Sequence, residues 1–302
     1  MKTMDSTAKT IWIDCDPGAD DALGILLLAA SGISIGGIVS CFGNGPSETT
    51  AENATKILRL AGRTDIPVFT GASQPLLRTF TPSMLYCGAD GLCETGLEPD
   101  HALMKKGSFI PELKRSAGKV TWLVTGALTN IAGLLQNEPE CRNIISEIVT
   151  ASGCFGLTEF AKRSEWNIEI DPDAAKTVYE SGIPIRAIGL DVTGQLQNVY
   201  TEQLIKGVSS NKIRQFLADC TRYNRNNGLS IYSLLNDAMT AAVILCPELA
   251  RFCRGYAEVY PDRKGTGMMS FRKDISGNVQ AAQSYDFSSY LSLLLGKLNI
   301  LE

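Results

Sequence analysis

The chain has 302 residues, of which 44% are hydrophobic and 20% are charged, and its net charge is −4 at pH 7. A chain of this length can bury a large core, either as one large α/β domain or as two smaller domains. The acidic balance gives no electrostatic case for a nucleic acid or an anionic membrane surface, so we expect neither as a partner.

The nine cysteines are odd in number and include no C-x-x-C pair. This pattern is typical of free, mostly buried thiols in a reducing cytosol, so we expect a cytoplasmic protein without a zinc site. The single histidine, His101, lies in a polar stretch and is expected at the surface. Residues 1–9 form a polar arm with no apolar run, so no signal peptide is visible. Residues 22–47 carry no charge, but their glycines and serines favour a helix, a turn and a buried strand over a membrane span.

Apolar runs alternate with helical patterns over most of the chain, which predicts an α/β fold with a largely parallel, open sheet and flanking helices. The first six strands are expected at 10–13, 33–41, 67–70, 120–125, 144–151 and 184–190. Helical spacing in this part occurs at 22–30, 48–60, 129–136 and 171–180. Longer helices follow at 201–207, 211–226 and 237–246, then strands at 256–259, 267–271 and 278–282 and a closing helix at 287–298. Since no linker or repeat interrupts the pattern, we expect residues 1–302 to form a single domain, with 81–98 as a candidate lid loop.

Four carboxylates, those of Asp14, Asp16, Asp20 and Asp21, crowd the turn between the first predicted strand and its helix. Four like charges this close cannot all stay ionised without a compensating cation. An oxygen-only cluster at the carboxyl end of a strand, where α/β sheets place their ligands, suggests a hard divalent ion. The alternative is a solvated acidic turn that caps the helix, but such a turn does not need acids folded back beside a Pro-Gly pair.

Polar groups also follow other strands that should end at the same edge of the sheet. These groups lie at 43–45, 125–130, 152–156, 164–168 and 236–237. Any one of them could be a turn or a helix cap. Together with the acidic turn they would surround one pocket with metal ligands and hydroxyl-binding groups.

The sequence Asp-Cys-Asp-Pro-Gly-Ala-Asp-Asp-Ala, from Asp14 to Ala22, resembles the N-terminal signature of the inosine-uridine nucleoside hydrolases. The resemblance continues in the same order through 42–44, 124–132, 165–175 and 236–238. It implies a nucleoside hydrolase-like fold with the active site at the carboxyl ends of the strands. It also implies Ca²⁺-dependent hydrolysis of the N-glycosidic bond of a small-molecule ribonucleoside to ribose and free base. A homodimer or homotetramer that serves purine or pyrimidine salvage would be usual.

The resemblance assigns a role to individual residues. The ligands of Ca²⁺ would be the carboxylates of Asp16, Asp21 and Asp237 and the main-chain carbonyl of Thr125. Asp16 would also be the general base. The groups that grip the ribose hydroxyls would be Asp20, Asn44, Glu165 and Asn167, and Asp14 would steady the acidic loop from behind.

General chemistry is consistent with these roles. Ca²⁺ held by carboxylates, a carbonyl and water has free positions for two vicinal hydroxyls. The ion lowers the pKa of a bound water, and an adjacent carboxylate can take its proton. Attack at the anomeric carbon then passes through an oxocarbenium-like state, as in glycoside hydrolysis generally. Trp166 could present its π face to that positive charge, and a role as a plain core aromatic is an equal alternative.

The residues around the leaving base depart from the family pattern. The best-known members read His-Asp-Ala at the last motif, and that histidine protonates the base, whereas this chain has Asn236, which can donate a hydrogen bond but not a proton. The nearest match to a second expected histidine is Asp90. Residues 151–153 read Ala-Ser-Gly in place of Met-Gly-Gly, and Glu159 falls near an asparagine that often binds the 5′-hydroxyl. Leaving-group activation by Asn236 is therefore expected to be atypical.

Two compensations and two other functions stay open. Stacking on Tyr223 or Tyr232 could raise the pKa of the base, or Asp90 could supply the proton. A non-catalytic, Ca²⁺-dependent nucleoside- or sugar-binding protein is the main alternative function, because the usual leaving-group acid is missing. A Mg²⁺-dependent, haloacid-dehalogenase-like phosphatase with Asp14 as nucleophile is a weaker one.

Overall fold

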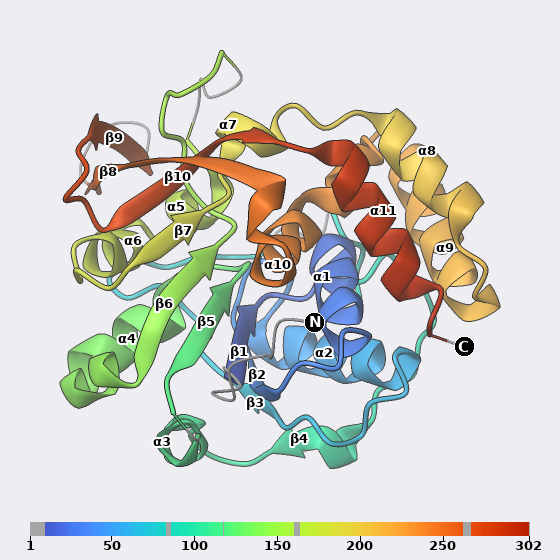
Figure 1. The fold of residues 1–302 in the computed structure, drawn as a ribbon. Coiled ribbons are helices and arrows are strands. Elements are labelled where there is room, and N and C mark those ends of the chain that lie inside the picture. Colours follow the sequence, from blue (N-terminus) through green and yellow to red (C-terminus); the bar gives the residue numbers. More distant parts are fainter. Residues whose placement is uncertain (1–9, 83–85, 117, 160–163, 262–266, 302) are drawn as a thin grey trace, which may run out of the picture.

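The computed structural model describes residues 10–82, 86–116, 118–159, 164–261 and 267–301 (Figure 1). The predicted polar arm 1–9 and three residues of the predicted lid loop lie outside these ranges. No helix in the described ranges combines the length and the apolar character that crossing a bilayer requires.

One mixed sheet of ten strands organises the chain, in the order β4-β3-β2-β1-β5-β6-β7-β10-β8-β9. The strands are β1 (Thr10–Cys15), β2 (Ile35–Ser40), β3 (Val68–Thr70), β4 (Met104–Lys105), β5 (Val120–Val124), β6 (Ile145–Thr150), β7 (Ile185–Ala187), β8 (Ala250–Tyr260), β9 (Met268–Lys273) and β10 (Val279–Tyr285). Strands β1 to β7 and β10 pair in parallel, whereas β8 pairs antiparallel with β10 and β9 antiparallel with β8. The predicted largely parallel α/β fold is confirmed.

Helices cover both faces of the sheet (Figure 1). They are α1 (Ala19–Ala29), α2 (Ser47–Leu60), α3 (Ile110–Arg115), α4 (Thr129–Asn137), α5 (Trp166–Ile170), α6 (Pro172–Tyr179), α7 (Leu190–Thr193), α8 (Asn198–Gly207), α9 (Asn211–Asn226), α10 (Asn236–Leu245) and α11 (Phe287–Leu298). Strand β1 shows why two layers are needed, because its side chains alternate between the faces. Ile11 and Ile13 pack into the core beneath α1, α2, α10 and α11, while Trp12 stacks on Trp122 in the core beneath α4 and α6.

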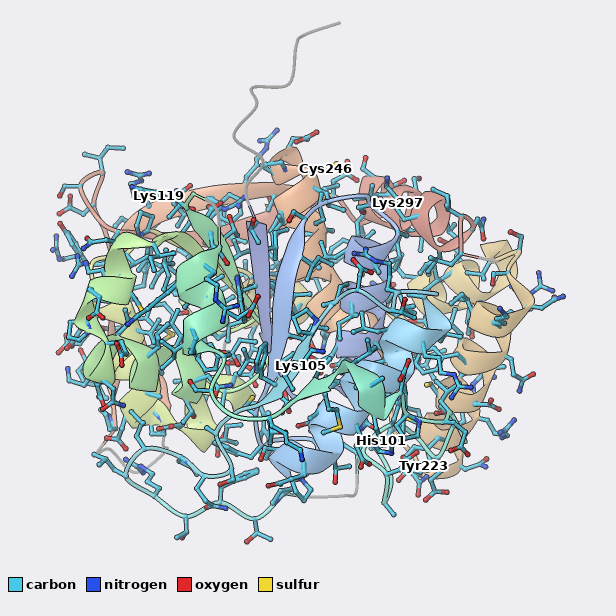
Figure 2. All side chains as sticks on the ribbon, turned by 90° about the horizontal axis from the view of Figure 1, so that it is seen from below. His101, Lys105, Lys119, Tyr223, Cys246 and Lys297 are labelled. Atoms are coloured by element: carbon cyan, nitrogen blue, oxygen red, sulfur yellow. The ribbon has the colours of Figure 1, made fainter. Side chains whose placement is uncertain are left out.

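The thiols and the histidine lie as predicted. The nine cysteines all lie in the described ranges, none of them forms a disulfide there, and most of them are buried. His101 is exposed in the segment that leads into β4 (Figure 2).

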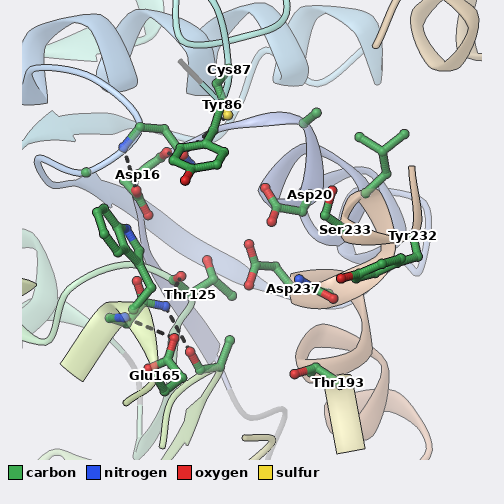
Figure 3. A pocket seen from close by; sticks show the side chains of 18 of the residues that line it. Asp16, Asp20, Tyr86, Cys87, Thr125, Glu165, Thr193, Tyr232, Ser233 and Asp237 are labelled. Carbon is green, nitrogen blue, oxygen red and sulfur yellow. Dashed lines mark hydrogen bonds between the residues drawn. The ribbon is translucent and has the colours of Figure 1, made fainter. Parts of the chain in front are cut away.

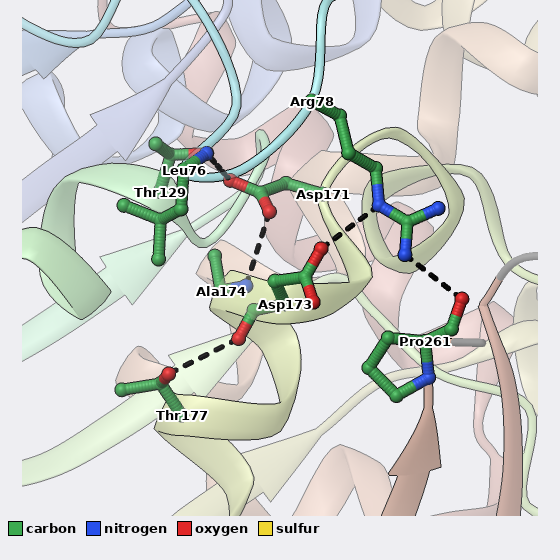
Figure 4. Close-up of polar contacts among 8 residues, drawn as sticks. All are labelled: Leu76, Arg78, Thr129, Asp171, Asp173, Ala174, Thr177 and Pro261. Carbon is green, nitrogen blue, oxygen red and sulfur yellow. Dashed lines mark hydrogen bonds and ion pairs between the residues drawn. The ribbon is translucent and has the colours of Figure 1, made fainter.

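A buried carboxylate ties three segments together on the α6 side of the sheet (Figure 4). Asp171 caps α6 by accepting a hydrogen bond from the Ala174 amide, and it also accepts from the Thr129 hydroxyl and from the Leu76 amide. Two residues along from Leu76, the Arg78 guanidinium pairs with the Asp173 carboxylate at 2.8 Å. The loop after β3 is thereby fixed to the protein body, and this loop carries Phe80 toward the site described next.

Candidate active site

The loops that leave the carboxyl ends of β1, β2, β5 and β6 enclose a cavity of about 650 Å³ (Figure 3). That volume is typical of a small-molecule site, for which roughly 300–1,000 Å³ is usual. The predicted site residues that line it are Asp16, Asp20, Asn44, Thr125, Glu165, Trp166, Asn167, Asn236 and Asp237. The two remaining ones, Asp14 and Asp21, are almost fully buried. Residues far apart in the sequence are therefore brought to one cavity.

The acidic turn is held in shape by its own hydrogen bonds. The Asp21 carboxylate closes the first turn of α1, since it accepts from the Gly18 amide at 3.0 Å and from the Thr125 hydroxyl at 2.6 Å. The Asn44 amide donates to Asp16 Oδ2 at 2.8 Å, and the Asn44 side chain donates to the Asp16 carbonyl at 3.0 Å. A Cβ on Gly43 would collide with Asp16 Oδ2, so only glycine lets the loop after β2 approach this carboxylate.

Three carboxylates form a group that could hold a metal ion. Oxygen atoms of Asp20, Asp21 and Asp237 all lie within 4.8 Å of one another. This group contains Asp20, which the sequence assigns to the ribose, and not Asp16. Figure 3 shows the Asp16 carboxylate directed toward the same central space as those of Asp20 and Asp237. The Thr125 carbonyl lines the site as well and accepts a hydrogen bond from Asn167 Nδ2 at 2.8 Å.

Burial raises the pKa of each carboxyl in this cluster. For Asp21 burial and repulsion from Asp20 raise it to about 7. Burial also raises the pKa values of Asp16 and Asp237 well above their usual range, with added repulsion from Asp21 on Asp16 and from Asp20 on Asp237. No lysine, arginine or histidine occurs among the described residues that line the cavity. Since the carboxylates of Asp16, Asp20 and Asp237 face this cavity without a basic residue in its described lining, the all-oxygen donor set fits a hard divalent cation.

Asp14 lies behind the turn and supports it. Its oxygens accept from Asn130 Nδ2 at 2.8 Å and from Trp122 Nε1 at 3.2 Å, and its side chain is fully buried. Burial raises its pKa to about 7. Asp14 is fully buried and is not among the described residues that line the cavity, so it is not placed to attack a phosphate there, and this counts against the phosphatase alternative.

Glu165 and Trp166 form one wall of the cavity. Glu165 caps α5, accepting at Oε1 from the Asn167 amide and at Oε2 from the Gly153 and Ile168 amides. Burial raises the pKa of Glu165 to about 7. The Trp166 side chain is 44% exposed and packs edge-on against Phe80 at 6.1 Å between ring centres. Trp166 is thus a cavity wall, and its interpretation as a plain core aromatic is wrong.

Another part of the cavity lining comes from residues 228–234 and from the start of α10 at Asn236. Asn236 opens α10 beside Asp237, and its buried Oδ1 has no hydrogen-bond partner among the described residues. Tyr232 lines the cavity next to it, whereas Tyr223 is not among the described lining residues.

Two other candidates do not reach the described cavity wall. Asp90 Oδ1 accepts from the Leu92 and Glu94 amides and so caps its own loop. Glu159 is exposed, and neither residue is among the described residues that line the cavity.

Several lining residues were not predicted individually, namely Tyr86, Cys87, Cys93, Leu190, Thr193, Asn224 and Leu229. The first three belong to the predicted lid loop 81–98, and the others come from loops and helix ends without a recognisable motif. Tyr86 is 54% exposed at the mouth of the cavity, and such an exposed aromatic is visible only once the fold places it there.

Comparison with known proteins agrees with this geometry. The model of the inosine-uridine preferring nucleoside hydrolases matches residues 11–292. The chain belongs to this family. It is therefore an N-glycosyl hydrolase of the nucleoside hydrolase class, as the sequence predicts.

The relatives of this nucleoside hydrolase include two bacterial enzymes. The pyrimidine-specific ribonucleoside hydrolase RihA of Escherichia coli O7:K1 (strain IAI39 / ExPEC) is 35% identical over 259 residues, which are 80% of this chain and 81% of that protein. The protein of the same name from Shigella boydii serotype 4 (strain Sb227) is 32% identical over 96% of this chain and 98% of its own length.

Solved nucleoside hydrolase structures show the same fold. The purine-preferring ribonucleoside hydrolase from Gardnerella vaginalis superposes with a TM-score of 0.84 at 26% identity, covering 97% of this chain and 99% of that one. A plant nucleoside hydrolase superposes with a TM-score of 0.83 at 26% identity, with the same coverage.

Proposed function

We propose that this nucleoside hydrolase cleaves the N-glycosidic bond of pyrimidine ribonucleosides with the help of one Ca²⁺ ion. The observation that carries the proposal is the group of Asp20, Asp21 and Asp237, whose oxygens lie within 4.8 Å of one another; Asp20 and Asp237 of this group line the cavity of about 650 Å³. Ca²⁺ takes six to eight oxygen ligands, which suits carboxylates supplemented by the Thr125 carbonyl and by Asp16. The names of the two bacterial relatives support a pyrimidine base. A cytoplasmic homodimer or homotetramer remains our expectation.

The reaction needs a general base that deprotonates the attacking water and residues that bind the ribose. Asp20, Asp21 and Asp237 would hold the ion, which would lower the pKa of the attacking water and favour binding of the ribose hydroxyls. Asp16 accepts one proton from the water as the water oxygen bonds to C1′ and the C1′–N bond breaks, and the base leaves with the electron pair of that bond and takes a proton from solvent. Its carboxylate is held for this role by the Asn44 amide. Asp20 and Asn167 lie where they can orient the 2′- and 3′-hydroxyls.

The exposed π face of Trp166 stabilises the positive charge that develops on the ribose ring. Phe80 fixes the Trp166 ring from its edge, and the Asp171 and Arg78 contacts fix the loop that carries Phe80. The wall that meets the transition state is therefore rigid rather than adaptable.

Asn236 leaves the departing base without a proton donor, and this predicts an unusual substrate order. A nitrophenyl riboside releases a stable anion and needs no proton, whereas uridine does. General-acid help is typically worth about 10²–10⁴-fold. We therefore expect kcat/KM for nitrophenyl riboside to exceed that for uridine by about this factor, as measured by release of nitrophenolate and of uracil.

The variant Asn236→His tests whether the missing proton donor limits uridine cleavage, because it introduces a possible donor. It should raise uridine turnover by about 10²-fold, the low end of what a positioned acid supplies, and change nitrophenyl riboside turnover much less. Asn211→His, at the exposed start of α9, is the matched control and should change neither rate. Equal rates on both substrates in the unmodified enzyme would show that another group already supplies the proton.

A further inference from the structure

The predicted lid loop 81–98 places a buried thiol in the cavity wall beside the acidic turn. Cys87 lines the cavity, although only 8% of this residue is exposed. Its Sγ donates a hydrogen bond to Asn44 Oδ1 at 3.3 Å, and it is the donor found for that oxygen among the described residues. Figure 3 shows Cys87 on the same side of the cavity as Asp16. The lid loop therefore contacts the loop after β2 through this thiol.

Main-chain hydrogen bonds hold Cys87 in place. The Cys93 amide donates to the Cys87 carbonyl at 2.6 Å and closes the loop between these two residues. Asn53, on α2, donates from Nδ2 to the Asp90 carbonyl at 2.9 Å and to the Pro17 carbonyl at 3.2 Å. The lid loop and the acidic turn are thus fixed to the same side chain, so the thiol has a defined position beside the turn.

The thiol sets the orientation of the Asn44 side-chain amide. An amide group offers two donor hydrogens on its nitrogen and an acceptor on its oxygen. With Oδ1 bonded to Cys87, Asn44 Nδ2 donates one hydrogen to the Asp16 carbonyl at 3.0 Å. Because Asn44 lines the cavity, the second hydrogen is available to a bound molecule. A flipped amide would place Oδ1 against the Asp16 carbonyl, so that two acceptors would face each other.

The state of the thiol suits this role. Burial raises the pKa of Cys87 well above its usual range, so the side chain keeps its proton and remains a hydrogen-bond donor. A buried, protonated thiol is also a poor nucleophile. Cys87 is therefore suited to orienting a neighbour and not to forming a covalent intermediate.

Ribose hydroxyls beside the carboxylates need a donor from the protein. Ionised carboxylates only accept hydrogen bonds, whereas a hydroxyl both donates and accepts. We propose that Cys87 is a positioning residue whose thiol holds the Asn44 amide with its nitrogen toward the Asp16 carbonyl and a ribose hydroxyl. This inference rests on the proposed function, since it places the ribose beside the carboxylates. The lid loop thereby contributes to ribose binding without contacting the sugar through this thiol.

A double-mutant cycle on the full-length enzyme, with uridine as substrate, tests the inference. Cys87→Ala should lower kcat/KM by about tenfold, because the Asn44 amide oxygen loses its donor. Cys87→Ser keeps a donor at the same position and should stay within about threefold of the unmodified enzyme. In the Asn44→Ala background, Cys87→Ala should change kcat/KM by less than about twofold, because the thiol then has no amide to orient.

Cys253→Ala is the matched control, since it removes a thiol outside the described cavity lining and should leave kcat/KM unchanged. Two outcomes would overturn the inference while uridine cleavage left the proposed function intact. One is a Cys87→Ala loss of the same size in both backgrounds, and the other is a Cys87→Ser enzyme as impaired as Cys87→Ala.

Binding gives a readout that does not require turnover. If uridine were bound but not cleaved, the proposed function would fail, and dissociation constants from calorimetry on the same variants would decide the inference. A thiol effect confined to proteins that retain Asn44 would support it, and an equal effect in both backgrounds would overturn it. The absence of uridine binding would overturn both proposals.

Discussion

Asp21→Ala should release the divalent ion and lower kcat/KM for uridine by about 10³–10⁴-fold, because a bound cation contributes several kcal/mol of transition-state stabilisation and each 1.4 kcal/mol is tenfold. Asp21 is central to the site, since it closes the first turn of α1 and contacts the Thr125 hydroxyl. Metal content by plasma mass spectrometry and steady-state kinetics on the same preparation measure the two effects together.

The matched control for this change is Asp65→Ala. Asp65 is a surface carboxylate paired with Arg63 and lies outside the cavity lining. It should keep both the metal and the activity. An Asp21→Ala enzyme that retained one metal per chain and normal turnover would show that the ion is held elsewhere.

The second large effect concerns the sugar. Uridine should be cleaved about 10⁴-fold faster than 2′-deoxyuridine, because the deoxy compound leaves buried carboxylates without the hydroxyl they are placed to bind. Burial raises the pKa of both Asp20 and Asp237, so these two carboxyls gain from a hydroxyl that donates a hydrogen bond to them. The measurement is kcat/KM for both compounds by separation of released uracil.

For this prediction 5′-deoxyuridine is the matched control, because it lacks one hydroxyl at the other end of the same ribose. Both compounds lose one hydroxyl, so a difference between their kcat/KM values reports which hydroxyl position matters and not the loss of a polar group as such. Similar rates for uridine and 2′-deoxyuridine would contradict the placement of the vicinal hydroxyls at the carboxylates.

The central strands could be predicted from the sequence because parallel strands buried on both faces appear as short apolar runs. All six predicted strands from 10–13 to 184–190 occur, and the closing helix begins and ends as predicted at Phe287 and Leu298. Helix α1 begins at Ala19, three residues before the predicted start at Ala22. The reason is that Asp21 caps the helix from within, a contact that periodicity does not reveal.

The missed elements are those that depend on tertiary contacts. Strand β4 has two residues and α7 has four, too short for any pattern, and both are held by neighbours that are distant in sequence. The acidic and amide residues that share the cavity could be predicted, because they lie in long motifs at strand ends. The rest of the lining could be predicted only in part: Tyr86 belongs to the predicted lid loop 81–98, whereas Leu190 lies in a segment whose position only the folded chain defines.

The most direct test of the account is base release with and without the ion. The purified enzyme is incubated with uridine, inosine and nitrophenyl riboside, and free base and ribose are quantified before chelation, after chelation and after Ca²⁺ is restored. The account predicts equal amounts of base and ribose from ribosides, loss of both after chelation, and recovery with Ca²⁺. Binding of ribonucleosides without release of base from any of them over long incubation would contradict it and would favour a non-catalytic, Ca²⁺-dependent binding protein.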